Sequence, residues 1–161
     1  MDDKPCADSP VAQLVRHYDI KSRNVIAHIR KATQGRTTLE NTHPFQRELW
    51  GGYWLFAHNG NLSAEFQPQT TYYQAVGCTD SERAFCYLLD QLRSRFSRKP
   101  GNDELFDALA ELCAQVREYG MFNMILSDGN VMFAHASTLL HYIVRQPPFG
   151  HAHLVDEDLE I

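Results

Sequence analysis

The sequence has no dense cluster of positive charge and no long apolar run, and these two absences narrow its partners. Its 15 Lys and Arg residues are outnumbered by 20 Asp and Glu residues, and they form no basic patch of the kind that binds nucleic acid. No apolar stretch approaches the roughly 18 residues that a membrane span needs. The first residues, Met1 to Pro5, are too polar and acidic for a signal peptide. We therefore expect a cytoplasmic protein without a nucleic-acid or membrane partner.

Motifs that pair metal ligands or redox thiols are also missing. The cysteines show no C-x-x-C spacing, which is typical of buried or idle thiols in a reducing compartment. The histidines include no H-x-x-x-H pair, so a zinc site is the weaker alternative, and we expect no metal and no cofactor. The cysteines are Cys6, Cys78, Cys86 and Cys113, and the histidines considered for zinc are His28, His43, His58, His151 and His153.

The chain does contain a regular succession of predicted elements. Its 161 residues, 43% of them hydrophobic, suit a single domain with a sizeable core. Strand patterns come first, two adjacent helix patterns follow, and strand patterns return, which predicts an α+β fold with helices packed against an antiparallel sheet. The predicted elements are a helix opened by Ser9-Pro10, strands at 24–31, 52–58, 121–126, 131–136 and 139–145, a helix that begins at Thr79, a helix at 103–119, and polar connections at 32–50 and 61–78.

The stretch 53–58 is almost wholly apolar and runs directly into Asn59 and Gly60. A strand that is apolar on both faces is typical of one covered from both sides. Asn-Gly is the strongest short signal for a hairpin turn, because both residues tolerate positive φ. The same residues could instead offer the Asn side-chain amide and the Gly N–H as two donors to a developing oxyanion. The dipeptide alone leaves both interpretations open.

Arg30 and Asp80 each have a structural and a functional interpretation. Arg30, on the predicted strand 24–31, either covers apolar surface with its stem or clamps a carboxylate with its planar guanidinium. Asp80 follows Thr79, which forms a capping box with Glu82. The Asp80 carboxylate either serves the helix dipole alone or binds the ammonium group of a substrate.

Four short motifs follow one another along the chain. They are residues 28–35 (HIRKATQG), 41–45 (NTHPF), 58–60 (HNG) and 79–82 (TDSE). In this order and at this spacing they resemble the class II (N-terminal-nucleophile) glutamine amidotransferases, and within that family the small stand-alone branch of the YafJ type. The likeness extends over nearly the whole chain, including 122–129 and 148–150.

This resemblance implies a pocket for the amino-acid part of glutamine. Arg30 would grip the α-carboxylate, and Thr33 would line the same pocket. Asp80 would receive the α-ammonium, and His43 would belong to a loop that shapes the pocket. The expected partner is therefore glutamine or a γ-glutamyl small molecule.

The resemblance also implies catalytic groups, one of which is not found here. Asn59 and Gly60 would form the oxyanion hole. The family's nucleophile is a cysteine at the mature N-terminus, whose own α-amino group acts as the base. This chain has Asp2 in second place, and Cys6 lies in a stretch that resembles the interior of family members. Whether the chain is an enzyme stays open, and we expect it to be inactive alone.

The fold implied by the resemblance is a four-layer α-β-β-α sandwich of antiparallel sheets. Residues 1–161 would form one partial domain that is truncated at both ends, without the strand that bears the nucleophile and without the closing strands. Exposed sheet edges would then need a partner chain or an oligomer to cover them. Two functions remain: hydrolysis of the side-chain amide of glutamine or of a γ-glutamyl amide in the complete protein, and a non-catalytic, partner-dependent amino-acid-binding role.

Overall fold

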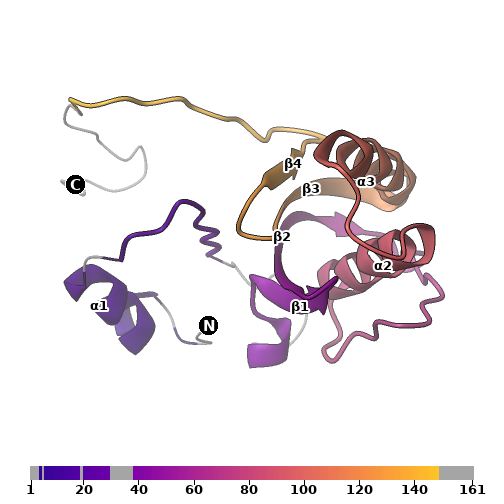
Figure 1. Ribbon diagram of the computed structural model, residues 1–161. Coiled ribbons are helices and arrows are strands. Elements are labelled where there is room, and N and C mark those ends of the chain that lie inside the picture. Colours follow the sequence, from indigo (N-terminus) through magenta and orange to yellow (C-terminus); the bar gives the residue numbers. More distant parts are fainter. Residues whose placement is uncertain (1–3, 5, 19, 30–37, 149–161) are drawn as a thin grey trace.

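The computed structural model describes residue 4 and residues 6–18, 20–29 and 38–148 of the chain. Within these residues one antiparallel sheet carries its strands in the order β1-β2-β3-β4, so that each strand pairs with its neighbour in sequence (Figure 1). The strands are β1 (Phe45–Leu49), β2 (Gly52–Leu62), β3 (Gly120–Ser127) and β4 (Met132–His135). β2 is the longest strand, and it pairs with β1 over its first half and with β3 over its second.

Two helices cover one face of this sheet, α2 (Asp80–Arg95) and α3 (Asn102–Val116) (Figure 1). The core lies between the helices and the sheet, and the rings of Phe56 from β2 and Phe85 from α2 stack there with centroids 5.0 Å apart. Both helices were predicted from an apolar stripe at helical spacing, and both are confirmed. The fully buried members of these two stripes are Phe85, Leu88, Leu89, Leu92, Leu105, Leu109, Leu112, Cys113 and Val116.

The predicted capping box at Thr79 is confirmed in its first half. Thr79 Oγ1 accepts a hydrogen bond from the N–H of Glu82 at 3.2 Å, which satisfies one free donor of the first turn. The Glu82 side chain is engaged elsewhere, because its carboxylate accepts the N–H groups of Val76 and Gly77. The cap therefore begins the helix, while Glu82 holds the loop that precedes it.

β2 contradicts the hairpin interpretation of Asn59-Gly60. The strand continues through both residues to Leu62, and they lie opposite Asn123 and Phe122 of β3. A long partner strand supplies ladder pairing on both sides of the dipeptide, and this pairing outweighs its local preference for a turn.

β1 was missed in the sequence, where 32–50 was interpreted as a loop. Phe45 and Leu49 are buried, but the residue between them on the same face is Arg47. A cation at the central inward position hides the alternation that marks a strand. Arg47 is accepted there because it forms an ion pair with Glu82 of α2.

Two predicted strands do not form among the described residues. Residues 24–29 and 139–145 are in neither helix nor strand, and the remainder of the first, 30–31, lies outside the described residues. An apolar run becomes a strand only when another strand satisfies its backbone groups. Val25, Ile29 and Tyr142 are accordingly exposed.

The helix expected at Ser9-Pro10 is confirmed as α1 (Pro10–His17), with Ser9 Oγ accepting the N–H of Ala12 at 3.0 Å. Its apolar stripe packs on nothing in the described part of the chain, since Leu14 and Val15 are both exposed. The described residues also form three short 3-10 helices: η1 (Cys6–Asp8), η2 (Leu39–Asn41) and η3 (Arg117–Tyr119).

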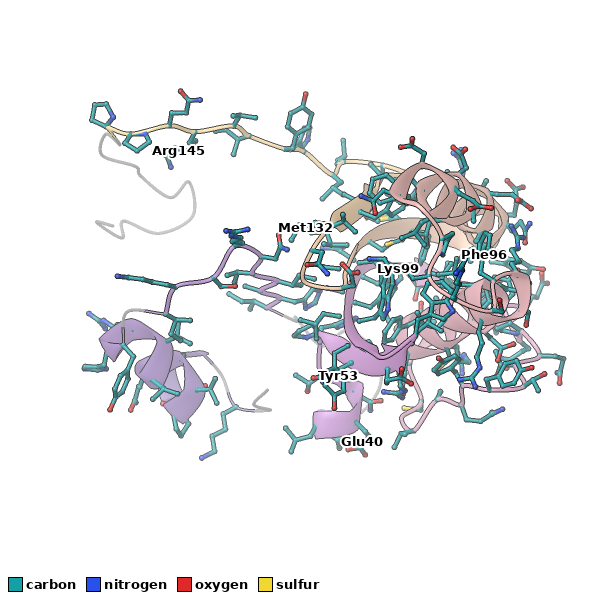
Figure 2. All side chains as sticks on the ribbon, viewed as in Figure 1. Glu40, Tyr53, Phe96, Lys99, Met132 and Arg145 are labelled. Atoms are coloured by element: carbon teal, nitrogen blue, oxygen red, sulfur yellow. The ribbon has the colours of Figure 1, made fainter. Side chains whose placement is uncertain are left out.

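The predicted α+β class with antiparallel pairing is confirmed, and the described residues form one β layer and one α layer of the expected sandwich. The other face of the sheet carries exposed apolar side chains. Figure 2 shows Tyr53 and Met132 on the side of the sheet away from α2 and α3. Tyr53 is 68% exposed and Met132 is 40% exposed.

Candidate active site

Asp80 is held at the point where α2 meets the end of β2. One carboxylate oxygen accepts the N–H of Leu62 at 2.7 Å, and the other accepts the N–H of Ser81 at 2.9 Å. The first turn of a helix also favours a negative charge, because its N–H dipoles point toward it. The structure therefore places a fixed carboxylate beside the last residues of β2.

The N–H of Gly60 points to the same edge of β2. Phe122 lies opposite Gly60, but its N–H donates to Ser137 Oγ at 2.8 Å, on the β4 side. Hydrogen-bonded and non-hydrogen-bonded pairs alternate in an antiparallel ladder, so Gly60 directs its N–H away from β3. Leu62, two residues further, directs its N–H to this same edge and meets Asp80 there.

β1 does not extend along this part of the edge. Its first residue, Phe45, pairs with Phe56, four residues before Gly60. The residues just before β1 lie here instead, because Asn41 accepts the N–H of Cys78 at 3.0 Å, close to the start of α2. The edge of β2 at Gly60 is thus flanked by the segment before β1 and by the first turn of α2.

Only glycine fits at position 60. A Cβ atom built there would lie 1.9 Å from the carbonyl oxygen of Met121 and 2.6 Å from Nε2 of His58. Backbone cannot yield to such a contact, so any side chain would push β2 and β3 apart. The glycine of the HNG motif is therefore required by packing as well as by its interpretation as a donor.

Asn59 leaves β2 on the other face of the sheet. Side chains alternate along a strand, so Asn59 is exposed on the face away from α2, opposite Asn123 in the register. Asn123 itself is buried, and its side-chain oxygen Oδ1 accepts the N–H groups of Ser137 and Thr138. The two predicted oxyanion donors are thus adjacent in sequence but leave the strand in different directions, one from the face and one from the edge.

His43 is buried in the segment that precedes β1. Its ring centroid lies 4.2 Å from that of His28 and 4.6 Å from that of Phe45. The role of His43 in shaping a pocket stays a prediction. Arg30 and Thr33, the predicted partners of the substrate carboxylate, lie outside the described residues.

The loop before Asp80 is held by two buried carboxylates. Glu82 accepts the N–H of Gly77 at 2.7 Å and pairs with Arg47 of β1. Asp90, about two turns further along α2, accepts the N–H groups of Thr71 and Tyr72. These contacts fix residues 71–77 and therefore the approach to the first turn of α2.

His58 and Ser81 were not predicted as site residues from the sequence. His58 is buried, and its Nδ1 lies 2.9 Å from Ser81 Oγ while its Nε2 lies 3.2 Å from the carbonyl oxygen of Met121. Burial lowers the pKa of the imidazole, and the Met121 carbonyl and the Asp80 charge only partly offset this effect. The sequence did contain a signal for these contacts, because a histidine at the end of a buried apolar strand must find partners for both ring nitrogens.

The two buried cysteines of the described residues offer no activated thiol. Burial raises the pKa of Cys86 to about 11 and that of Cys113 to about 12, so both thiols are protonated near neutral pH. Cys78 is exposed and lies beside Asn41. A nucleophilic cysteine needs a thiolate. Arg47 lies near Cys86 and favours its thiolate, but burial outweighs this effect, and burial alone raises the pKa of Cys113. No group of His, Cys, Asp and Glu side chains in the described part of the chain is arranged to hold a metal ion.

Comparison with known proteins places these residues in a family context. The family profile described as "Glutamine amidotransferases class-II" matches residues 1–161. The predicted glutamine amidotransferase YafJ of Escherichia coli K12 is 51% identical over 161 residues, which cover 99% of this chain and 63% of that protein. A predicted glutamine amidotransferase of Haemophilus influenzae is 50% identical over 157 residues, covering 98% of this chain and 53% of its own length.

A solved structure agrees with the fold. The crystal structure of a predicted glutamine amidotransferase from Pseudomonas aeruginosa superimposes with a TM-score of 0.69 at 48% identity, covering 76% of this chain and 48% of that one. This chain thus spans about half to two thirds of the length of the relatives it matches. None of the helices in the described ranges is long and apolar enough to cross a membrane.

Proposed function

This chain belongs to the class II glutamine amidotransferases, and we propose that it binds glutamine, or a γ-glutamyl amide, at the edge of β2 between Gly60 and Asp80. Because the chain spans only part of its relatives, hydrolysis of the side-chain amide is proposed for the complete protein. Residues 1–161 would then act as a single amidotransferase domain. A location in the cytoplasm stays a prediction from the sequence.

One observation carries this proposal: a donor and a fixed carboxylate share one strand edge. Asp80 accepts the N–H of Leu62, which is two residues from Gly60 along β2. The pairing of β2 with β3 directs the N–H groups of Leu62 and Gly60 to the same edge of β2. Glutamine has a cationic ammonium at one end and an amide carbonyl at the other. A carboxylate and an oxyanion donor on one edge match those two ends.

The chemistry follows from the charges. The ammonium would bind the Asp80 carboxylate, and Arg30 would bind the carboxylate of the substrate through two of its three guanidinium nitrogens. Attack on the side-chain amide develops negative charge on the carbonyl oxygen. The Gly60 N–H and the Asn59 amide would stabilise that charge, and removal of one such donor typically costs about 2.7–4 kcal/mol of barrier.

Neither Cys86 nor Cys113 supplies the nucleophile. Both thiols are protonated near neutral pH and buried in the core. We expect the 161-residue polypeptide to release no ammonia from glutamine. Detection of a glutamyl thioester on this polypeptide by mass spectrometry would contradict that expectation.

Binding is tested by calorimetry of the purified chain with L-glutamine and with N-acetyl-glutamine, which lacks the ammonium. We expect heat with L-glutamine only, and loss of that heat in Asp80→Asn, which keeps the acceptor for Leu62 but removes the charge. Asp103→Asn is the matched control, because Asp103 occupies the first turn of α3 and is exposed. Absence of heat from the unmodified chain at millimolar glutamine would contradict the proposal.

A second function, binding without catalysis, is favoured by the unactivated thiols. In that case the pocket would hold an amino acid, and the open face of the sheet would be covered by a partner chain or by another copy. Exposed Tyr53, Met121 and Met132 support a covering layer on that face. Glutamine binding without turnover, in any longer form of the protein, would favour this function over hydrolysis.

A further inference from the structure

His58 connects three elements at the candidate site. It lies on β2, its Nδ1 is 2.9 Å from Ser81 Oγ in the first turn of α2, and its Nε2 is 3.2 Å from the carbonyl oxygen of Met121 on β3. The side chain is 3% exposed. Water therefore cannot replace either contact without opening the junction between β2, β3 and α2.

The two contacts select one neutral form of the ring. The Met121 carbonyl can only accept, so Nε2 must carry the hydrogen. Nδ1 is then the acceptor, and the Ser81 hydroxyl must donate to it. The other neutral tautomer would direct a lone pair at the carbonyl oxygen.

The charged form of the ring is disfavoured by its surroundings. A cation would satisfy both contacts, but burial opposes it and the nearby His28 adds to that opposition. Asp80, at the start of α2, is the charged group that acts in the opposite direction. The pKa of His58 is lowered overall, so the ring is neutral near pH 7.

The ring also meets Gly60 directly. A Cβ atom at position 60 would lie 2.6 Å from Nε2 of His58, so the imidazole occupies the space that a side chain would take. The same ring reaches Ser81, whose N–H binds the Asp80 carboxylate. One side chain therefore touches both the donor end and the carboxylate end of the proposed pocket.

We propose that His58 is a positioning residue that, as its neutral Nε2–H tautomer, accepts the Ser81 hydroxyl and donates to the Met121 carbonyl, and so holds Gly60 at a set place relative to Asp80. The role of His58 rests on the proposed function, since it orders the donor and the carboxylate that glutamine would contact. His58 itself touches no reacting atom in this arrangement.

The first test determines which ring nitrogen of His58 carries the hydrogen. In the 161-residue chain labelled with ¹⁵N-histidine, long-range ¹H–¹⁵N correlation distinguishes a protonated Nε2 from a protonated Nδ1. We expect a protonated Nε2 and an unprotonated Nδ1 at pH 7. An Nδ1–H tautomer, or a ring that is charged at pH 7, would overturn the inference.

The second test asks whether the contact orders Gly60. We expect Ser81→Ala to lower the heteronuclear NOE of the Gly60 amide, and Ser81→Thr, which keeps a hydroxyl, to restore it. His135→Gln is the matched control, because His135 is a partly buried histidine near Phe122 that lies outside the site. Equal order at Gly60 in Ser81→Ala and Ser81→Thr would refute the positioning role, even if both variants fold normally.

The third test separates this inference from the proposed function. Loss of one hydrogen bond predicts glutamine binding about 2- to 10-fold weaker in Ser81→Ala, with Ser81→Thr and His135→Gln unchanged. If the unmodified chain binds glutamine and Ser81→Ala binds it equally well, the role of His58 is refuted while the proposed function stands. If the unmodified chain binds none, the proposed function fails, and the order of the Gly60 amide decides the role of His58.

Discussion

The two faces of the sheet are built from the same strands and have opposite environments. On the face that α2 and α3 cover, Phe56, Phe122 and Leu126 are at most 1% exposed. On the other face, Tyr53 and Met121 are 68% and 47% exposed. The apolar run 53–58 contributes to both faces: Trp54 and Phe56 pack into the core, whereas on the other face Tyr53 is exposed and Ala57 is buried.

The candidate site lies where these two environments meet. His58 belongs to the covered face, Asn59 to the open face, and the Gly60 N–H to the edge between them. The rigid packing is therefore on one side of the site, and the Asn59 side chain is on the other. We expect substitutions on the covered face to act through stability, and substitutions on the open face to act through association.

The largest effect is expected in the core of the covered face. Phe85→Ala removes a fully buried ring that stacks on Phe56, and it should lower the free energy of unfolding by about 3–5 kcal/mol. Urea unfolding followed by circular dichroism measures this change. If Phe85→Ala lowered the free energy of unfolding no more than Tyr53→Ala does, the proposed difference in packing between the two faces would be contradicted.

A smaller effect is expected at the carboxylate that joins β1, the loop and α2. Glu82→Gln removes the charge that Arg47 pairs with, and it should lower the free energy of unfolding by about 1–3 kcal/mol. The control is Glu111→Gln, which breaks the exposed pair with Arg95 and should cause no detectable change. Equal losses in the two variants would mean that burial does not strengthen the Glu82 contacts.

A pH effect is expected from His58. Because the folded pKa is lowered, the unfolded chain binds a proton first as the pH falls below the ordinary histidine value of about 6.5. The stability that depends on neutral His58 is therefore full above that pH and is lost as the pH falls toward the folded pKa. His58→Asn should show a flatter decline between pH 7.5 and 5.5 in urea unfolding.

A second histidine, His135, also contributes to the pH dependence of the stability. Burial lowers its pKa too, so it contributes to the acid sensitivity with the same sign. The informative quantity is thus the difference between the unmodified chain and His58→Asn, not the slope of either one. Parallel slopes for the two proteins would show that His58 is charged or solvated in the folded chain.

The smallest change in stability is expected on the open face. Tyr53→Ser and Met132→Ser remove exposed apolar side chains and should alter the free energy of unfolding by less than about 0.5 kcal/mol. They should instead reduce self-association, measured by sedimentation velocity. If either variant unfolds easily, that face is packed in solution by a layer that the described residues do not contain.

Local patterns were sufficient for the helices and for part of the site. The cap at Thr79 and the stripe from Phe85 to Leu92 each depend on neighbours within a few residues, and both were predicted correctly. Asp80 could also be placed from a neighbouring residue, because the N-cap at Thr79 puts Asp80 at the first position of the helix. Asn59 and Gly60 were singled out as two possible donors at the end of an apolar strand and then by the likeness of their motif, and their roles stay predictions.

Features that depend on distant residues could not be predicted. Asn59-Gly60 resembles a turn until β3 provides a partner, and 45–49 resembles a loop until Glu82 accepts Arg47. The strand patterns at 24–29 and 139–145 lack pairing for the converse reason, because no strand in the described residues lies beside them. The contacts of His58 likewise join residues 23 and 63 positions away.

Composition and short motifs were thus enough to establish the α+β class, the helix starts and the family to which the chain belongs. Folding in three dimensions was needed to bring Leu62 to Asp80, to direct the Gly60 N–H toward the same edge, and to place His58 between Ser81 and Met121. The physical reason is the range of the interactions. Caps and apolar stripes act within a turn or two of helix, whereas ladder pairing and buried hydrogen bonds depend on residues that the sequence keeps far apart.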